Sequence, residues 1–245
     1  MKTQSNNTKS LTASPLLDDK APENKLLTAF LLGLVAIMLT LLILISVVGT
    51  CVVSGNSMDP TLYGGNASAE IEGDRVLVNK FARIAPGDII ALKAPAAAVG
   101  YKGKLFIKRV VAVGGDTVRF TLIDVPPSNS TTPPFFQPDT KTGVAVFVKS
   151  KNSTDFKPFL DYNLYEPMTY GTYCSKLEFD KNGVYEFTVP SDHFYYMGDN
   201  RNHSSDSRSY GSSPLKDVYG KMFHKLKPGT FTDWFFRILY RTPTQ

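Results

Sequence analysis

The chain has 245 residues, 42% of them hydrophobic and 20% charged, which suits one membrane anchor and one folded domain of about 200 residues. Its two cysteines permit at most one internal disulfide, so the composition excludes a disulfide-rich scaffold, and three scattered histidines argue against a His/Cys zinc site. The net charge of +5 comes without a Lys/Arg run or a nucleic-acid motif, so we expect no nucleic-acid partner.

The N-terminal part predicts one membrane-spanning helix. Residues 1–25 are polar and typical of a disordered tail, whereas residues 26–48 carry no charge. A helix of that length reaches roughly 35 Å, enough to cross a bilayer core with some tilt. The run is longer than the apolar region of a cleavable signal peptide, and it is apolar on every face, unlike a core helix. We therefore expect a retained transmembrane helix over residues 26–49.

The distribution of basic residues predicts the orientation of this helix. Four lysines precede the apolar run: Lys2, Lys9, Lys20 and Lys25. After the run, the next Lys or Arg is Arg75. Because positively charged flanks stay in the cytoplasm, we expect a single-pass protein of the cytoplasmic membrane. Its N-terminus would lie inside and residues 50–245 would lie on the outer face.

The sequence after the apolar run predicts β-structure. Short runs rich in β-branched and aromatic residues, bounded by Gly, Pro, Asp and Asn, occupy residues 76–78, 88–92, 105–113, 145–148, 184–189 and 193–197. Such spacing predicts a mainly β domain, an antiparallel barrel or sandwich, over residues 50–245. We find no convincing amphipathic helix in it. Residues 125–142 carry five prolines and indicate a loop-rich insertion that forms a small subdomain at about 121–183.

The C-terminal residues 234–241 are aromatic and basic. A segment of this composition either touches lipid headgroups or packs against the β domain. The sequence leaves both alternatives open.

A candidate nucleophile lies shortly after the apolar run. Ser57 is part of the stretch Ser-Gly-Asn-Ser-Met-Asp-Pro-Thr-Leu at residues 54–62, in which Pro60 fixes a turn. A serine hydroxyl is a weak nucleophile and needs a base within hydrogen-bond reach. Histidine is one candidate base, but His193, His203 and His224 all lie far along the chain in undistinguished settings. A Ser-His-Asp arrangement therefore stays open without specific support.

Lysine is the other candidate base. In a strand over residues 105–113, Lys108 would share a face with Phe106 and Val110, because residues two apart point the same way. Burial on an apolar face lowers the pKa of a lysine toward neutrality, and a neutral amine can accept the serine proton. The alternative is an ordinary strand lysine whose amine reaches the surface.

A third stretch, residues 197–211, is dense in hydrogen-bonding groups. It does not fit an EF-hand calcium loop, because Arg201 and Ser204 occupy positions that would need an oxygen ligand and a glycine. Asp206 and Arg208 could pair, and Ser204 could orient a neighbouring amine. A plain polar loop is the remaining alternative.

Together these stretches resemble the type I signal peptidases, the membrane-bound leader peptidases of the Ser/Lys class. The resemblance covers about residues 26–120 and 184–222. Five segments resemble the conserved boxes of that family in their usual order: residues 57–62, 73–80, 86–90, 107–116 and 198–208.

The resemblance implies Ser57 as nucleophile and Lys108 as general base, with no metal and no cofactor. It implies that Ser204 orients the lysine amine and that Asp206 and Arg208 hold the last box in place. Some members carry a hydroxyl residue two positions before the nucleophile, where this chain has Gly55. The oxyanion would then depend on backbone N–H groups, that of Ser57 above all.

The resemblance also implies the partners. They are membrane lipid and exported preproteins with small residues at the first and third positions before the cleavage site. Two other functions remain open: a dedicated relative that matures one substrate such as a conjugation pilin, and an inactive membrane-anchored binding module.

Overall fold

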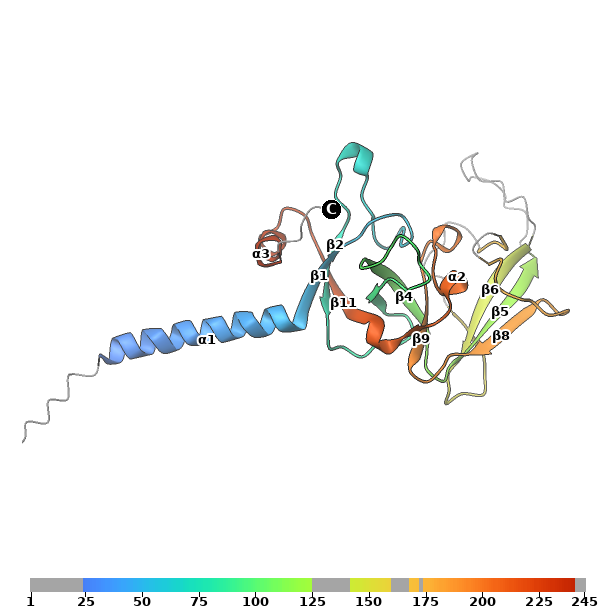
Figure 1. The fold of residues 1–245 in the computed structure, drawn as a ribbon, viewed down its shortest axis with the longest axis horizontal. Helices are drawn as coiled ribbons and strands as arrows, with labels where there is room; N and C mark the ends of the chain where they lie inside the picture. The colour runs from blue at the N-terminus through green and yellow to red at the C-terminus, as the bar shows by residue number, and fades with distance from the viewer. Residues whose placement is uncertain (1–23, 125–141, 160–167, 172–173, 241–245) are drawn as a thin grey trace, which may run out of the picture. The chain divides into compact units, whose positions relative to one another are not determined.

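The computed structural model describes residues 24–124, 142–159, 168–171 and 174–240. The chain divides into two units, residues 1–43 and 44–245. Most of the predicted tail, at 1–25, and nearly all of the proline-rich stretch, at 125–142, fall outside the described residues. Across the described part, an apolar helix is followed by antiparallel β-sheets and short helices (Figure 1).

The expected N-terminal apolar helix is present as α1, Lys25–Val47. Its mean hydropathy of 3.0 and its length make it able to cross a membrane on these two criteria. The helix ends earlier than the predicted position 49, because β1, Val48–Val52, begins at once and pairs with β2. Lys80, just after β2, binds the end of α1: its N–H donates to Val47 O at 2.9 Å and its amine to Ile45 O at 3.0 Å.

The predicted mainly antiparallel β architecture is confirmed. The larger sheet is curled and has the strand order β1-β2-β11-β3-β4-β9-β10 (Figure 1). After β1, its strands are β2 (Arg75–Asn79), β3 (Ile89–Lys93), β4 (Leu105–Val113), β9 (His193–Met197), β10 (Ser213–Pro214) and β11 (Val218–Leu226). Consecutive neighbours in this order all pair in the antiparallel sense.

Buried side chains on the two faces of this sheet form separate clusters. One cluster contains Met58, Leu62, Val76, Val78 and Ala91. The other contains Ile90, Leu92, Val110, Phe194 and Tyr196. Neighbouring residues of β3, Ile90 and Ala91, enter different clusters, because side chains alternate across a strand. The sheet therefore has two buried faces, which explains its apolar strands.

The smaller sheet has the order β7-β6-β5-β8. Its strands are β5 (Thr117–Asp124), β6 (Thr142–Lys149), β7 (Lys157–Pro158) and β8 (Val184–Thr188). Phe120 is fully buried at the centre of a third cluster, where it packs with Val146, Tyr195 and other apolar side chains. The predicted insertion, residues 121–183, therefore starts within β5 and ends directly before β8.

Several elements were not predicted. The strands β1, β5, β7, β10 and β11 were not predicted. β1 directly continues the apolar run, β7 and β10 have two residues each, and β5 and β11 mix polar residues into their sequences. β11 also shifts register at bulges with both neighbours. The short helices are η1 (Ala67–Ala69), η2 (Arg201–His203), α2 (Ser207–Tyr210), η3 (Leu215–Asp217) and α3 (Phe231–Leu239). The helix α3 corrects our statement that no amphipathic helix follows the apolar run. The helix is short, and its three adjacent aromatic residues, Trp234, Phe235 and Phe236, obscure the helical period in the sequence.

Phe120 offers a test of the core of the smaller sheet. Phe120→Ala should destabilise the protein by about 3–5 kcal/mol, because it removes a fully buried ring and leaves a cavity. Ile123 lies in the same strand but is 41% exposed, so Ile123→Ala should cost well under that amount. Thermal unfolding of the two variants in one detergent measures the difference. Equal effects would contradict the described packing.

Candidate active site

The stretch that carries Ser57 forms a turn early in the connection between β1 and β2, residues 53–74. Gly55 has φ +77°, a left-handed conformation that favours glycine. Two buried side chains, Met58 and Leu62, fix the loop to the sheet, each being 1% exposed. The N–H of Leu62 donates to Met58 O at 3.0 Å, which closes the turn between them. The side chain of Ser57 therefore projects from a rigidly held backbone.

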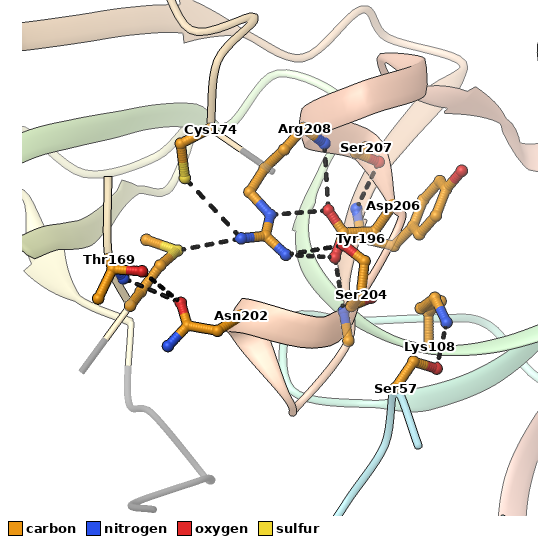
Figure 2. A network of polar contacts seen from close by, with 12 residues as sticks. Ser57, Lys108, Thr169, Cys174, Tyr196, Asn202, Ser204, Asp206, Ser207 and Arg208 are labelled. Carbon is orange, nitrogen blue, oxygen red and sulfur yellow. Dashed lines mark hydrogen bonds and ion pairs between the residues drawn. The ribbon is translucent and has the colours of Figure 1, made fainter. Parts of the chain in front are cut away.

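Lys108 meets Ser57 from β4. A hydrogen bond of 2.6 Å joins Lys108 Nζ and Ser57 Oγ (Figure 2). As predicted, Lys108 shares its strand face with Phe106, whose ring centroid lies 5.4 Å from the amine. The lysine is only 5% exposed, and this burial lowers its pKa from 10.5 to about 8. Asp206 and Asp199 act in the opposite direction, and Arg208 adds to the lowering.

The loop around Ser57 is docked onto the segment that follows β9. The N–H of Asn200 donates to Ser57 O at 3.1 Å, and its side-chain amide donates to Asn56 O at 3.0 Å. Gly198 lies in the same contact: a Cβ at this position would collide with the Ser57 carbonyl oxygen and with Ser204 Oγ. Only glycine therefore allows the two segments to approach this closely.

A buried ion pair braces this contact. Asp199 accepts two hydrogen bonds from the guanidinium of Arg109, at 2.7 and 2.6 Å, and a third from the Thr61 hydroxyl at 2.6 Å. Arg109 also donates to Gly87 O at 2.7 Å. The carboxylate of Asp199 thus connects β4, the Ser57 loop and the segment after β9.

The predicted pairing of Asp206 with Arg208 is present and fully buried. Arg208 Nε and Nη2 donate to the two oxygens of Asp206 at 2.9 and 2.8 Å, and the N–H of Gly198 donates to the same carboxylate at 3.0 Å (Figure 2). Burial alone would raise the pKa of Asp206, but the charge and hydrogen bonds of Arg208 outweigh it and hold this pKa below its usual value. The carboxylate therefore stays charged and fixes the 198–208 segment.

Arg208 also contacts the segment of the chain between β7 and β8. Its Nη1 lies 3.4 Å from the sulfur of Met168 and 3.9 Å from that of Cys174 (Figure 2). Cys174 is buried and is a free thiol, as is Cys51. The guanidinium thus lies between the polar site and the core of the smaller sheet.

The structure brings most of the predicted site residues together. Of the two kinds of base that the sequence leaves open, the lysine is the one bonded to Ser57, while His193 pairs with Asp192 at 2.7 Å. Ser204 is buried beside Gly198. The hydrogen bond that the structure shows for the Lys108 amine goes to Ser57. That Ser204 orients this amine therefore stays a prediction.

The bracing residues Thr61, Arg109, Asp199 and Asn200 were not assigned roles from the sequence. All four lie in or beside the segments quoted for the resemblance, which was the one signal that could have found them. Among the described residues, no group of three or more His, Cys, Asp or Glu side chains could hold a metal ion.

Comparison with known proteins places this site in a family. The family model described as "Signal peptidase, peptidase S26" matches residues 26–226, which include Ser57, Lys108 and the 198–208 segment. The chain belongs to the signal peptidase family. The match ends before α3.

Individual relatives agree with the family assignment. The chain is 29% identical over 234 residues to signal peptidase I of Mycobacterium tuberculosis, covering 78% of this chain and 68% of the relative. It is 28% identical over 207 residues to signal peptidase I of Aquifex aeolicus, covering 68% and 71%. A solved signal peptidase I from Enterococcus faecalis aligns with 18% identity and a TM-score of 0.32, covering 58% of this chain and 98% of that one. The family match and the identities to the two sequence relatives make the chain a peptidase of the signal peptidase class.

Gly198 provides a test of the docking between the two segments. Gly198→Ala should lower the cleavage rate of a signal-peptide substrate by roughly 100-fold, because a shift of about 1 Å in a reacting group has a cost of that order. Gly171→Ala is the matched control, since a Cβ at Gly171 meets nothing within 4 Å. Rates are compared at equal amounts of folded protein. A Gly198→Ala protein with the rate of the control would contradict the described contact.

Proposed function

We propose that this protein is a membrane-anchored serine endopeptidase that removes N-terminal signal peptides from exported preproteins, with Ser57 as nucleophile and Lys108 as general base. The observation that carries the proposal is the 2.6 Å contact between Ser57 Oγ and the buried Lys108 amine. The family assignment supports the substrate class.

Burial of Lys108 gives the amine the property that a general base requires. With a pKa of about 8, part of the amine population is neutral near physiological pH, and a neutral amine can accept a proton. Ser57 lies within direct hydrogen-bond reach of this amine. The serine hydroxyl is therefore activated without a histidine.

The reaction proceeds in two steps. Lys108 takes the proton of Ser57 as Ser57 Oγ attacks the scissile carbonyl carbon. The protonated amine then gives this proton to the leaving amine, the C–N bond breaks, and the mature protein departs from an acyl-enzyme. Lys108 next takes a proton from water, the hydroxyl group attacks the ester carbon, and the signal peptide leaves with a free carboxylate as Ser57 regains its proton.

The negatively charged oxygen of each tetrahedral intermediate needs hydrogen-bond donors. We assign this role to the backbone N–H of Ser57. Gly55 supports the assignment, because its φ of +77° disfavours a residue with a side-chain donor at this position. The docking of Ser57 O by Asn200 holds the backbone of the loop in place for that role.

The substrate segment binds in an extended conformation, with small side chains at the first and third positions before the scissile bond. The helix α1 spans the cytoplasmic membrane with its N-terminus inside, and the β domain works on the outer face. This arrangement keeps the enzyme in the plane of the signal helices of its substrates, which raises their effective concentration. The four lysines before α1 and the apolar length of α1 support it.

Substitution of the two central residues tests the mechanism. Ser57→Ala and Lys108→Met should each abolish processing of a preprotein, the first by removing the nucleophile and the second by keeping an apolar stem of similar length without the amine. His203→Ala should largely spare processing and serves as the control. Product formation is followed on a gel, with thermal unfolding as a check of the fold. Normal cleavage by Lys108→Met would exclude the Ser/Lys mechanism.

The dependence of cleavage on pH tests the state of the lysine. Because only the neutral amine accepts the proton, kcat/KM should rise with pH, with a midpoint at about 8, and then level off. An ordinary exposed lysine would place the midpoint near its unperturbed pKa of about 10.4 instead. The profile is measured with a short peptide substrate in detergent. A midpoint near that of an unperturbed histidine, about 6.5, would point to a different base.

A further inference from the structure

The C-terminal helix α3, Phe231–Leu239, has an apolar face that the β domain does not cover. Phe231, Trp234 and Ile238 lie at helical spacing on one side, and they are 73%, 56% and 60% exposed. Surface helices of globular domains normally turn this kind of face toward the core. In α3 the residue that is buried is instead a carboxylate, Asp233, which is 4% exposed.

Charged residues fix α3 in this inverted orientation. Arg237 donates to Asp233 at 2.9 Å and pairs with Glu72 at 2.7 Å. Arg75, on β2, pairs with the same two carboxylates, at 3.7 Å and 2.7 Å. Rotation of α3 to bury its apolar face would break the Arg75–Asp233 and Arg237–Glu72 pairs, although the Arg237–Asp233 contact lies within the helix and would turn with it. The exposed face is therefore held outward by the structure rather than left there by a loose end of the chain.

The place of α3 in the fold indicates what covers this face. Phe236 packs against a cluster of Val48, Leu77 and Leu226, which the last residues of α1 also join. The Tyr240 hydroxyl lies 2.6 Å from Val48 O and 3.2 Å from Leu44 O. These contacts attach α3 to the point where the apolar helix ends and β1 begins, at the β1 edge of the larger sheet (Figure 1). That point is where a spanning helix leaves the hydrocarbon core.

We propose that the exposed face of α3, made by Phe231, Trp234 and Ile238, inserts into the interfacial layer of the membrane that α1 spans, so that the protein contacts lipid at a second place. Aromatic side chains are favoured at the headgroup level, and a short helix with one apolar face lies in the plane of that layer. Lys80 and Phe81 fit the same environment: the lysine binds Ile45 O, and the adjoining phenylalanine is 75% exposed.

This contact would hold the β1 edge of the domain at the membrane surface. One spanning helix leaves a domain free to tilt, whereas a second contact beside the exit of the helix restricts that freedom. The loop that carries Ser57 begins directly after β1, so its height above the lipid would be set by α3. The family match, which ends at residue 226, does not include this helix.

The chain contains its own reporter for the proposal, because Trp234 is its single tryptophan. The full-length protein is reconstituted into vesicles whose lipids carry bromine at chosen depths, and fluorescence is quenched in parallel by iodide in the water. Trp234 should be quenched most by bromine near the headgroup end of the acyl chain, and it should be protected from iodide. Quenching by iodide without any effect of bromolipid, or protection from both quenchers as under a second protein, would overturn the proposal.

Two variants provide the comparison. Phe231→Ser combined with Ile238→Ser changes two exposed residues and leaves Asp233 and Arg237 in place, so Trp234 should lose its bromolipid quenching and become accessible to iodide. Val99→Ser is the control, since Val99 is 90% exposed but lies in the loop between β3 and β4. Full bromolipid quenching in the double variant would show that the face does not hold Trp234 in lipid.

The inference rests on the proposed membrane anchoring by α1. The experiment separates a failure of that anchoring from a failure of the lipid contact of α3. Loss of the full-length protein from the vesicles in an alkaline carbonate wash would reject both. Retention with an iodide-accessible Trp234 would reject the role of α3 alone. Cleavage of a short peptide in detergent should be the same for the wild type and the double variant, so that a failure of the Ser57–Lys108 mechanism would be seen independently.

Discussion

The site depends on a lysine amine that is held out of water against a serine hydroxyl. Lowering the pKa of Lys108 from 10.5 to about 8 corresponds to about 3 kcal/mol of disfavoured charge. This cost is fully present below about pH 8, where the buried amine is protonated, and it is lost as the pH rises toward 10.5, so that folding stability increases over this range. The fold tolerates the cost because the two sheet faces on either side of β4 are otherwise well packed.

Two buried carboxylates near this amine could cancel the effect. Asp206 and Asp199 both favour the charged lysine and so oppose the lowering of its pKa by burial. Each of them is paired with its own arginine, Arg208 for Asp206 and Arg109 for Asp199. Both arginines hold the polar segments in place, and Arg208 also lowers the pKa of Lys108, against the effect of Asp206.

The sequence was a good guide where a residue pattern has one physical meaning. The uncharged run could form little other than an apolar helix. The β-branched and aromatic residues at 105–113 predicted the strand that carries Lys108. The roles of Asp199 and Gly198 could not be read in this way, because they depend on contacts with Thr61 and Ser57, which lie far away along the chain. α3 was missed because adjacent aromatic residues obscure its helical period, and its orientation depends on contacts with Glu72 and Arg75, which are distant in the chain.

The strand order has a consequence for how the protein is made. β11, formed by residues 218–226, lies in the middle of the larger sheet between β2 and β3, which are far ahead of it in the chain. Until it emerges, β2 with β1 and β3 with β4 remain two separate hairpins, so Ser57 and Lys108 belong to different pieces. Pairing between such distant segments forms late, because the intervening chain must first be ordered. The pieces that carry Ser57 and Lys108 are thus joined into one sheet only after β11 has been synthesised.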